Sequence, residues 1–267
     1  QAGRGFWPGL CTTLKHSCRF ASFVLLAKGD YPAELNIPLP FALLRDDPSG
    51  NRLVVMPAYW WLHNMYALAR NTWKYQARDK RKTRTQHIEF DCLAPDTAEE
   101  IITALHLLEI FTAQSRRRRD GEPIEGLDGD VLAAEGRALL QLPAEQTDAL
   151  EVLGENMENS RRKTVLVQTR RGYLAYRQML HYYAMKNLLD HRRTRPELNI
   201  AAMVEDLKAP RCRSWVNLGG QLVKQSDVDR LRVDIGQGRL TSWAEIHRAY
   251  DQLWTDYPKE KQRHALA

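Results

Sequence analysis

The chain has 267 residues, 43% of them hydrophobic and 27% charged. This balance is typical of a globular protein with a buried core and excludes an intrinsically disordered chain. Its 39 Lys and Arg residues outnumber its 33 Asp and Glu residues, and the net charge of +6 predicts only a mild attraction to anions. The apolar runs are far shorter than the roughly 20 residues of a membrane-spanning helix, so we expect no transmembrane segment and no membrane partner.

Four cysteines are scattered along the chain without a Cys-x-x-Cys pair. This spacing indicates neither a zinc site nor a disulfide framework, so we expect a reducing, cytoplasmic setting and assign no metal ligand. The first residue is Gln1, and no signal-peptide pattern follows it. We therefore expect the chain to be the C-terminal segment of a longer protein.

A six-residue period runs through the first thirty residues. Pro8, Leu14, Phe20 and Leu26 recur at every sixth position, and most are followed by a small residue. A helix would need spacings of three and four, and a simple strand a spacing of two. A bulky apolar residue at every sixth position is typical of a parallel β-helix, in which each hexapeptide forms one side of a triangular coil.

Prolines and turn residues follow this repeat. Pro32, Pro38 and Pro40 end it, because proline cannot donate a ladder hydrogen bond. The turn sequence 47–51 then separates two apolar runs, 41–44 and 52–56. We expect these two runs to form a hairpin.

Helical periodicity dominates from Pro57 onward. Trp61, Met65 and Leu68 share one helix face, and capping-box pairs occur at Thr97 with Glu100 and at Ser242 with Glu245. A β-branched run at 163–168 predicts a short strand, and the glycine-rich stretch 120–130 predicts a loop. The expected helices are 58–82, 97–117, one around 173–188, 226–235 and 242–257.

Several stretches carry a family resemblance. Leu14–Lys15–His16–Ser17–Cys18 resembles the apolar-small-His-Asp-Cys segment of some bacterial hexapeptide-repeat acyltransferases, with Ser17 where the family usually has an acidic residue. The exit segment 27–41, together with 56–61, 93–97 and 215–221, resembles an uncharacterised bacterial family that joins a left-handed β-helix to a helical region of unknown function. The implied fold is mixed α and β, mostly α: residues 1–44 end a left-handed β-helix, and residues 45–267 form a mainly helical domain.

The resemblance implies that His16 is a catalytic base. It would take a proton from an amine or hydroxyl as that group attacks an acyl thioester, a task that suits a histidine with a pKa near 7. Lys15 and Lys28 would then contact anionic parts of the substrate. The alternative is a histidine that merely lines the coil.

The segment 155–163 mixes amides, a hydroxyl and three cations. Arginine forks and a lysine suit a phosphate or carboxylate, and amides can orient a sugar or base. The alternative is a solvated turn whose local ion pairs contribute little. The candidate ligand contacts are Asn159, Arg161, Arg162 and Lys163.

Other motifs favour no chemistry of their own. A strand at 87–91 would place His87, Glu89 and Asp91 on one face, which could bind a metal but is more often the wet side of an edge strand. Gly219-Gly220 is better explained by a turn than by a ligand's close approach. No GxGxxG, Walker or GxSxG motif occurs, so Rossmann, P-loop and hydrolase functions have no support.

Basic residues gather in four runs. Each run alone is best explained as a solvated face, but together they favour some anion affinity, and Trp73 and Tyr75 precede the first run. The runs are 78–84, 116–119, 161–163 and 192–195.

The leading hypothesis is a protein that resembles hexapeptide-repeat transferases, with acyl or nucleotidyl transfer to a sugar-nucleotide-like or other phosphorylated substrate. The resemblance implies a homotrimer with ligands held between neighbours, and acetyl-CoA or another acyl-CoA as co-substrate. The second hypothesis is a non-catalytic interaction or oligomerisation module with anion affinity. The third is an RNA- or polyanion-binding domain, which salt-dependent binding would identify.

Overall fold

The computed structural model describes residues 1–83 and 85–267. Arg84, the last member of the first basic run, lies outside the described residues. The chain divides into two compact units. The first unit contains residues 1–71 and 100–179, and the second contains residues 72–99 and 180–267.

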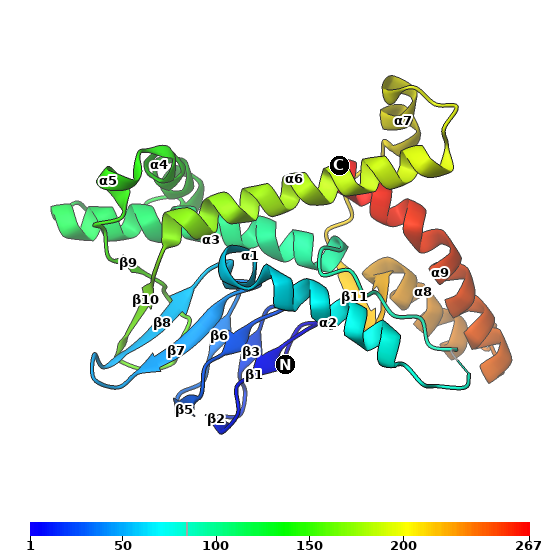
Figure 1. The fold of residues 1–267 in the computed structure, drawn as a ribbon, viewed down its shortest axis with the longest axis horizontal. Helices are drawn as coiled ribbons and strands as arrows, with labels where there is room; N and C mark the ends of the chain where they lie inside the picture. Colours follow the sequence, from blue (N-terminus) through cyan, green and yellow to red (C-terminus); the bar gives the residue numbers. More distant parts are fainter. Residues whose placement is uncertain (84) are drawn as a thin grey trace. The chain divides into compact units, whose positions relative to one another are not determined.

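Short strands at the start of the first unit pair in parallel with strands 17 or 18 residues further along (Figure 1). Trp7 pairs with Leu25, and Leu25 pairs with Leu43, so the chain returns to the same sheet after 18 residues. Between these returns it contributes to two other small sheets, β2–β5 and β3–β6. The strands are β1 (Trp7–Pro8), β2 (Thr12–Leu14), β3 (Arg19–Phe20), β4 (Leu25–Leu26), β5 (Gly29–Tyr31), β6 (Asn36–Ile37) and β7 (Leu43–Asp47).

Two of the four residues that define the six-residue period lie in the core. Phe20 and Leu26 are buried, Leu14 is half-buried and Pro8 is exposed. The period then slips by one residue, because Tyr31 pairs with Leu14 at a spacing of 17. Tyr31 is fully buried, and its hydroxyl donates to the carbonyl oxygens of Ala27 and Leu44.

The predicted hairpin is confirmed as β7 and β8 (Arg52–Met56), which pair antiparallel. The predicted strand at 163–168 is also confirmed as β10 (Lys163–Leu166), which pairs in parallel with β8 and antiparallel with β9 (Val152–Leu153). One sheet in the described part of the chain therefore has the order β1-β4-β7-β8-β10-β9. The domain boundary expected after residue 44 falls inside β7.

The helices agree with the expected pattern in part. The single helix expected at 58–82 is wrong, because the backbone leaves the helical region at Asn64 (φ −143°) between α1 (Tyr59–His63) and α2 (Met65–Arg78). The helix expected at 97–117 is longer, as α3 (Pro95–Asp120). The remaining helices are α4 (Gly129–Gln141), α5 (Ala144–Thr147), α6 (Thr169–Thr194), α7 (Ile200–Leu207), α8 (Gln225–Gly236) and α9 (Trp243–Leu266).

The two predicted capping boxes have different outcomes. Ser242 and Glu245 form the box at the start of α9. Thr97 and Glu100 do not, because α3 already begins at Pro95 and the Glu100 carboxylate accepts hydrogen bonds from the amide and hydroxyl of Ser22 instead. A long-range tertiary contact therefore replaces the local one.

In the second unit, β11 (Trp215–Leu218) and β12 (Gln221–Lys224) form an antiparallel hairpin. Gly219 and Gly220 make its turn with φ angles of 65° and 115°, which confirms the turn interpretation. The core beneath it contains Ala94, Leu222 and Tyr257, with Trp215 and Trp254 packed against them.

The fold is mixed α and β with more helix than strand, as expected. In the described residues, every helix is too short or too polar to cross a membrane.

Candidate functional site

The sequence-predicted histidine lies at a corner of the N-terminal strands. His16 and Lys15 follow β2, and both side chains are exposed. Ser17 takes up a left-handed conformation (φ 65°) that turns the chain toward β3. His16 is therefore on the outer surface of a turn, accessible to a ligand.

A polar pocket of about 480 Å³ adjoins this corner. Two backbone hydrogen bonds bring a distant segment to it: Asn36 N–H donates to the Met157 carbonyl, and Asn159 N–H donates to the Glu34 carbonyl, each at 2.9 Å. The strand edge is thereby covered by residues 156–159. The pocket is lined by Ser17, Arg19, Glu34, Leu35, Asn36, Asn156, Glu158 and Asn159.

The charges in this pocket leave one arginine available. The Glu158 carboxylate, buried, accepts two hydrogen bonds from Arg162, each 2.6 Å long. Glu34 accepts a 3.4 Å hydrogen bond from the Asn159 amide. Arg19 is exposed, and its guanidinium has no carboxylate partner among residues 1–83 and 85–267. Arg19 is therefore the pocket's free cation, although sequence reasoning did not select it.

The three cations at 161–163, which were predicted to bind an anion, lie in different environments. Arg162 also donates to Asp46 at 2.6 Å, and hydrogen bonds from its guanidinium to Glu158 raise its pKa despite desolvation. Lys163 and Arg161 are both exposed, and Lys163 pairs with Glu151 at 2.8 Å. A ligand at Arg162 or Lys163 would have to displace these carboxylates.

Lys15 and Lys28 do not meet at one corner. Lys15 follows β2 and Lys28 precedes β5, and these two strands are parallel partners. The two lysines therefore lie at opposite ends of the same face. The structure brings Asn159 next to the corner that carries His16, and Lys28 stays apart from it.

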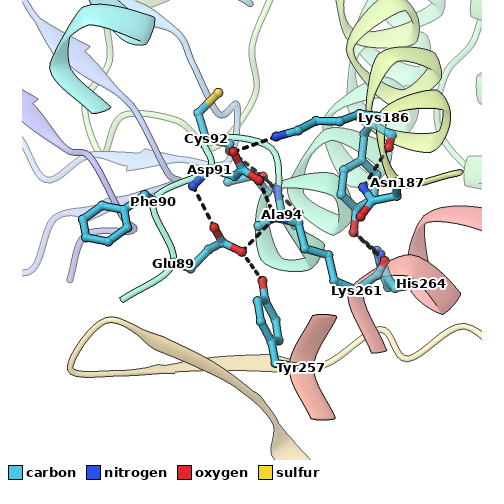
Figure 2. Close-up of polar contacts among 12 residues, drawn as sticks. Glu89, Phe90, Asp91, Cys92, Ala94, Lys186, Asn187, Tyr257, Lys261 and His264 are labelled. Atoms are coloured by element: carbon cyan, nitrogen blue, oxygen red, sulfur yellow. Dashed lines mark hydrogen bonds and ion pairs between the residues drawn. The ribbon is translucent and has the colours of Figure 1, made fainter. Parts of the chain in front are cut away.

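A second candidate region is a network of charged side chains in the second unit, which is buried at Glu89 and Lys261 and partly exposed at Asp91 and Lys186 (Figure 2). Lys261 of α9 donates to Glu89 at 2.8 Å and to Asp91 at 2.7 Å, and its side chain is only 10% exposed. Lys186 of α6 donates to the other oxygen of Asp91 at 2.7 Å. Glu89 also accepts from the Asp91 amide N–H and the Tyr257 hydroxyl. Two carboxylates are thus held by two lysines and a tyrosine.

The pKa shifts of Asp91 and Lys186 both favour the charged form. Burial disfavours the charged form of Asp91, but the attraction of Lys261 and hydrogen bonds from both lysines hold its pKa below the usual value. Burial would lower the pKa of Lys186, yet its hydrogen bond to Asp91 raises it. Burial and the negative charge of Glu89 raise the pKa of Tyr257. Its phenol therefore donates a hydrogen bond and is not a nucleophile.

A histidine lies beside this network on the same helix. His264 Nδ1 is 3.1 Å from the Tyr183 hydroxyl, and Nε2 is 2.9 Å from Glu99. Burial lowers the pKa of His264, although Glu99 partly opposes this. The neutral ring therefore predominates at pH 7, with Nε2 facing Glu99. The Tyr183 hydroxyl lies beside Nδ1 and donates to the Lys261 carbonyl oxygen at 3.3 Å.

This network is better explained as a set of structural ion pairs than as a metal site. Glu89 and Asp91 lie on one side as the alternation at 87–91 indicated, although that segment is not a strand. His87 instead contacts Asp251 at 2.7 Å. In the part of the chain that is described, no group of three His, Cys, Asp or Glu side chains is placed to hold a metal ion.

The burial of Lys261 and His264 could be predicted from the sequence. Tyr250 and Tyr257 belong to the apolar stripe of the last helix, and Lys261 and His264 continue it at i+4 and i+7 from Tyr257. An ionisable residue on a buried stripe needs a partner. The pattern indicates burial, but it does not identify the partners, which are about 170 positions away along the chain.

Comparison with known proteins gives one informative match. No family model matches the chain, and no solved structure matches it. The chain is similar to an uncharacterized protein of Treponema pallidum (strain Nichols), with 42% identity over 266 residues. The match covers the whole of this chain and 35% of that protein, so the chain spans about a third of the length of this relative.

Proposed function

We propose that residues 1–44 are the last coils of a left-handed β-helix and that the protein is a hexapeptide-repeat transferase acting on a phosphorylated, sugar-nucleotide-like substrate. The backbone conformation supports the coil. Left-handed residues recur at every sixth position, Gly5, Cys11, Ser17 and Phe23, with φ between 56° and 66°. Together with the parallel pairing at 17 or 18 residues, this favours a coil with three six-residue sides.

The pocket at the His16 corner is the observation that carries the transfer function. Arg19 supplies a free guanidinium for a phosphate, and the amides of Asn36, Asn156 and Asn159 supply donors and acceptors for a sugar or base. His16 adjoins the pocket through Ser17. In acyl transfer, His16 would take the proton of an attacking amine or hydroxyl as the new bond to the acyl carbon forms. The thiolate of the acyl-CoA leaves and then receives that proton.

The proposal includes a homotrimer and a reducing compartment. The trimer would form through the coil, with ligands between neighbouring subunits, as the family resemblance implies. All four cysteines are free thiols, which supports a cytoplasmic setting.

Ligand binding tests the pocket. We expect UDP-N-acetylglucosamine or acetyl-CoA to bind the wild-type protein in isothermal titration calorimetry. Arg19→Gln should raise the Kd about 10- to 100-fold, because a hydrogen bond to a charged group contributes about 1.5–3 kcal/mol. Arg45→Gln is the matched control, since Arg45 is an exposed cation on β7 outside the pocket. Equal effects of the two variants would contradict a phosphate site at Arg19.

Thiol release tests the base. With acetyl-CoA and a panel of UDP-amino sugars as acceptors, we expect His16→Ala to reduce release of free CoA thiol by about 10²- to 10⁴-fold, the usual contribution of a general base. His181→Ala, at an exposed histidine of the second unit, should leave the rate unchanged. Unchanged turnover in His16→Ala would exclude His16 as the base. Absence of turnover with every acceptor would argue against acyl transfer.

A non-catalytic interaction module is the second candidate, favoured by an apolar stripe on α6. Tyr182, Met185 and Leu189 lie at i, i+3 and i+7 and are 54%, 55% and 53% exposed. The two candidates differ in what holds an oligomer together. Leu10, between β1 and β2 in the proposed coil, is 88% exposed. If light scattering gives three times the chain mass of 30.9 kDa, Leu10→Asp should dissociate the trimer. Met185→Ser with Leu189→Ser should dissociate it only if the helical part is the oligomerisation module.

A further inference from the structure

One face of α2 carries alternating aromatic and basic side chains. Tyr66, Arg70 and Trp73 lie at i, i+4 and i+7, the spacing of a single helix face. Tyr66 is 77% exposed and Trp73 is 65% exposed. Leu68, the buried residue of this helix, points in the opposite direction. We refer to Tyr66, Arg70, Trp73 and Lys74 as the aromatic–basic face of α2.

The cations of this face are not neutralised by carboxylates of the described residues. The Arg70 guanidinium stacks over the Tyr66 ring at 5.7 Å. Arg70 and Lys74 form no ion pair with a carboxylate anywhere in the described residues. Tyr75 differs from the other aromatic residues, because its ring packs against Phe90 at 5.4 Å. Tyr75 is also on the opposite side of the helix, so the exposed aromatic residues of the face are Tyr66 and Trp73.

The positive charge continues beyond the helix. Residues 65–83 contain six Lys or Arg residues and one carboxylate, Asp79, a net charge of +5. Asp79 pairs with Arg81 at 2.8 Å. The net charge of the whole chain is +6, so this segment carries nearly all of the excess. The exposed cations that follow the face are Arg78, Lys80 and Lys82.

We infer that the aromatic–basic face of α2 and the following basic residues bind single-stranded nucleic acid. Exposed rings stack on unpaired bases, and the cations between them neutralise the phosphates that join those bases. This combination is sequence-tolerant, since every base has a ring face to stack on. The aromatic–basic face of α2 is thus complementary to a flexible chain of phosphates that carries unpaired bases.

The arrangement fits an anionic membrane less well. A helix that lies on a membrane separates an apolar face, which enters the lipid, from a basic face, which remains in the headgroups. In α2 the rings of Tyr66 and Trp73 share one face with two cations. On the opposite side, Leu68 is buried and the partly exposed Tyr75 packs against Phe90. The observed interleaving therefore favours bases and phosphates over lipid.

Fluorescence anisotropy with labelled U20 RNA and dT20 DNA tests this inference on the full chain. We expect binding at low salt, with log K falling against log salt at a slope of about −3, because each phosphate contact on a single strand contributes about −0.7 and four or five cations are available. Trp73→Ala should weaken binding about 5- to 100-fold, the effect of losing one base stack. Lys74→Gln with Arg78→Gln should make the slope shallower by about 1.4.

Trp243→Ala is the matched control, because Trp243 is a 77% exposed tryptophan at the start of α9 without cations interleaved on its face. It should leave the affinity unchanged. Absence of binding to both oligonucleotides at low salt would overturn the inference, as would equal losses in Trp73→Ala and Trp243→Ala. Sedimentation with phosphatidylcholine–phosphatidylserine vesicles (3:1) is the second arm. Vesicle binding that depends on Trp73, without oligonucleotide binding, would also overturn it and identify a membrane surface.

Discussion

Replacing Lys261 by Met should destabilise the second unit strongly. The ammonium group donates to both Glu89 and Asp91, at 2.8 and 2.7 Å, from a side chain that is 10% exposed. A hydrogen bond to a charged group contributes about 1.5–3 kcal/mol, and breaking a buried ion pair by removing one partner costs about 3–5 kcal/mol. Asp91 keeps Lys186, and Glu89 keeps two donors. We therefore expect a loss of about 3–5 kcal/mol in unfolding free energy.

Lys259→Met is the matched control for this change. Lys259 is on the same helix, is 46% exposed and pairs with Asp206 at 3.4 Å. Exposed pairs contribute about 0–1 kcal/mol, so its removal should cost less than 1 kcal/mol. Urea unfolding followed by circular dichroism measures both variants, with the dependence on urea concentration compared to check that the transition remains two-state.

A double variant separates the contribution of the Glu89–Lys261 ion pair from that of side-chain packing. In Glu89→Gln with Lys261→Met, both charges of the pair are absent, so the loss should be smaller than the sum of the two single losses. Two results would refute the reasoning: a Lys261→Met loss no greater than that of Lys259→Met, or strict additivity of the two single variants.

Two further predictions concern pH and helix packing. Burial places the pKa of His264 below its usual 6.5, so just below that pH the unfolded chain binds more protons than the folded chain. The free energy of unfolding should therefore fall as the pH decreases through 6.5. His264→Gln should make this decrease less steep in urea titrations at pH 5.5 and 7.5. Gly136→Ala would place a Cβ 1.8 Å from the Glu109 carbonyl oxygen. Thermal unfolding should therefore show that the free energy of unfolding falls by more than about 2 kcal/mol. Gly129→Ala at the start of α4 is the control, because its Cβ would make only a 3.8 Å contact, and it should leave the stability nearly unchanged.

Local patterns predicted local structure well. The hairpin at β7–β8, the turn at Gly219-Gly220 and the cap at Ser242 each depend on a few neighbouring residues, and the structure contains all three. The six-residue period identified Phe20 and Leu26 as core residues, but Leu14 is half-buried and Pro8 is exposed.

The errors came from contacts between distant residues. Glu100 has the spacing of a capping residue, yet its carboxylate bonds to Ser22, which is 78 positions earlier. The break at Asn64 is local instead, because the backbone leaves the helical region where the apolar spacing alone would continue the helix. For the candidate site, sequence reasoning selected His16 and Asn159 from different segments, but only the backbone bonds to Glu34 and Asn36 bring 156–159 to the His16 corner. Arg19 was missed because its availability depends on how the neighbouring carboxylates are paired.

The charge distribution separates the two proposed binding surfaces. Residues 65–83 carry a net charge of +5 out of +6, so the remainder of the chain is almost neutral. General attraction to polyanions should therefore arise from the α2 segment and weaken steeply with salt. Phosphate binding at the His16 corner would depend instead on Arg19 and a few amides, which are directional contacts in a pocket. Salt dependence alone should then distinguish the two surfaces: an oligonucleotide should dissociate at a salt concentration that leaves a nucleotide sugar bound.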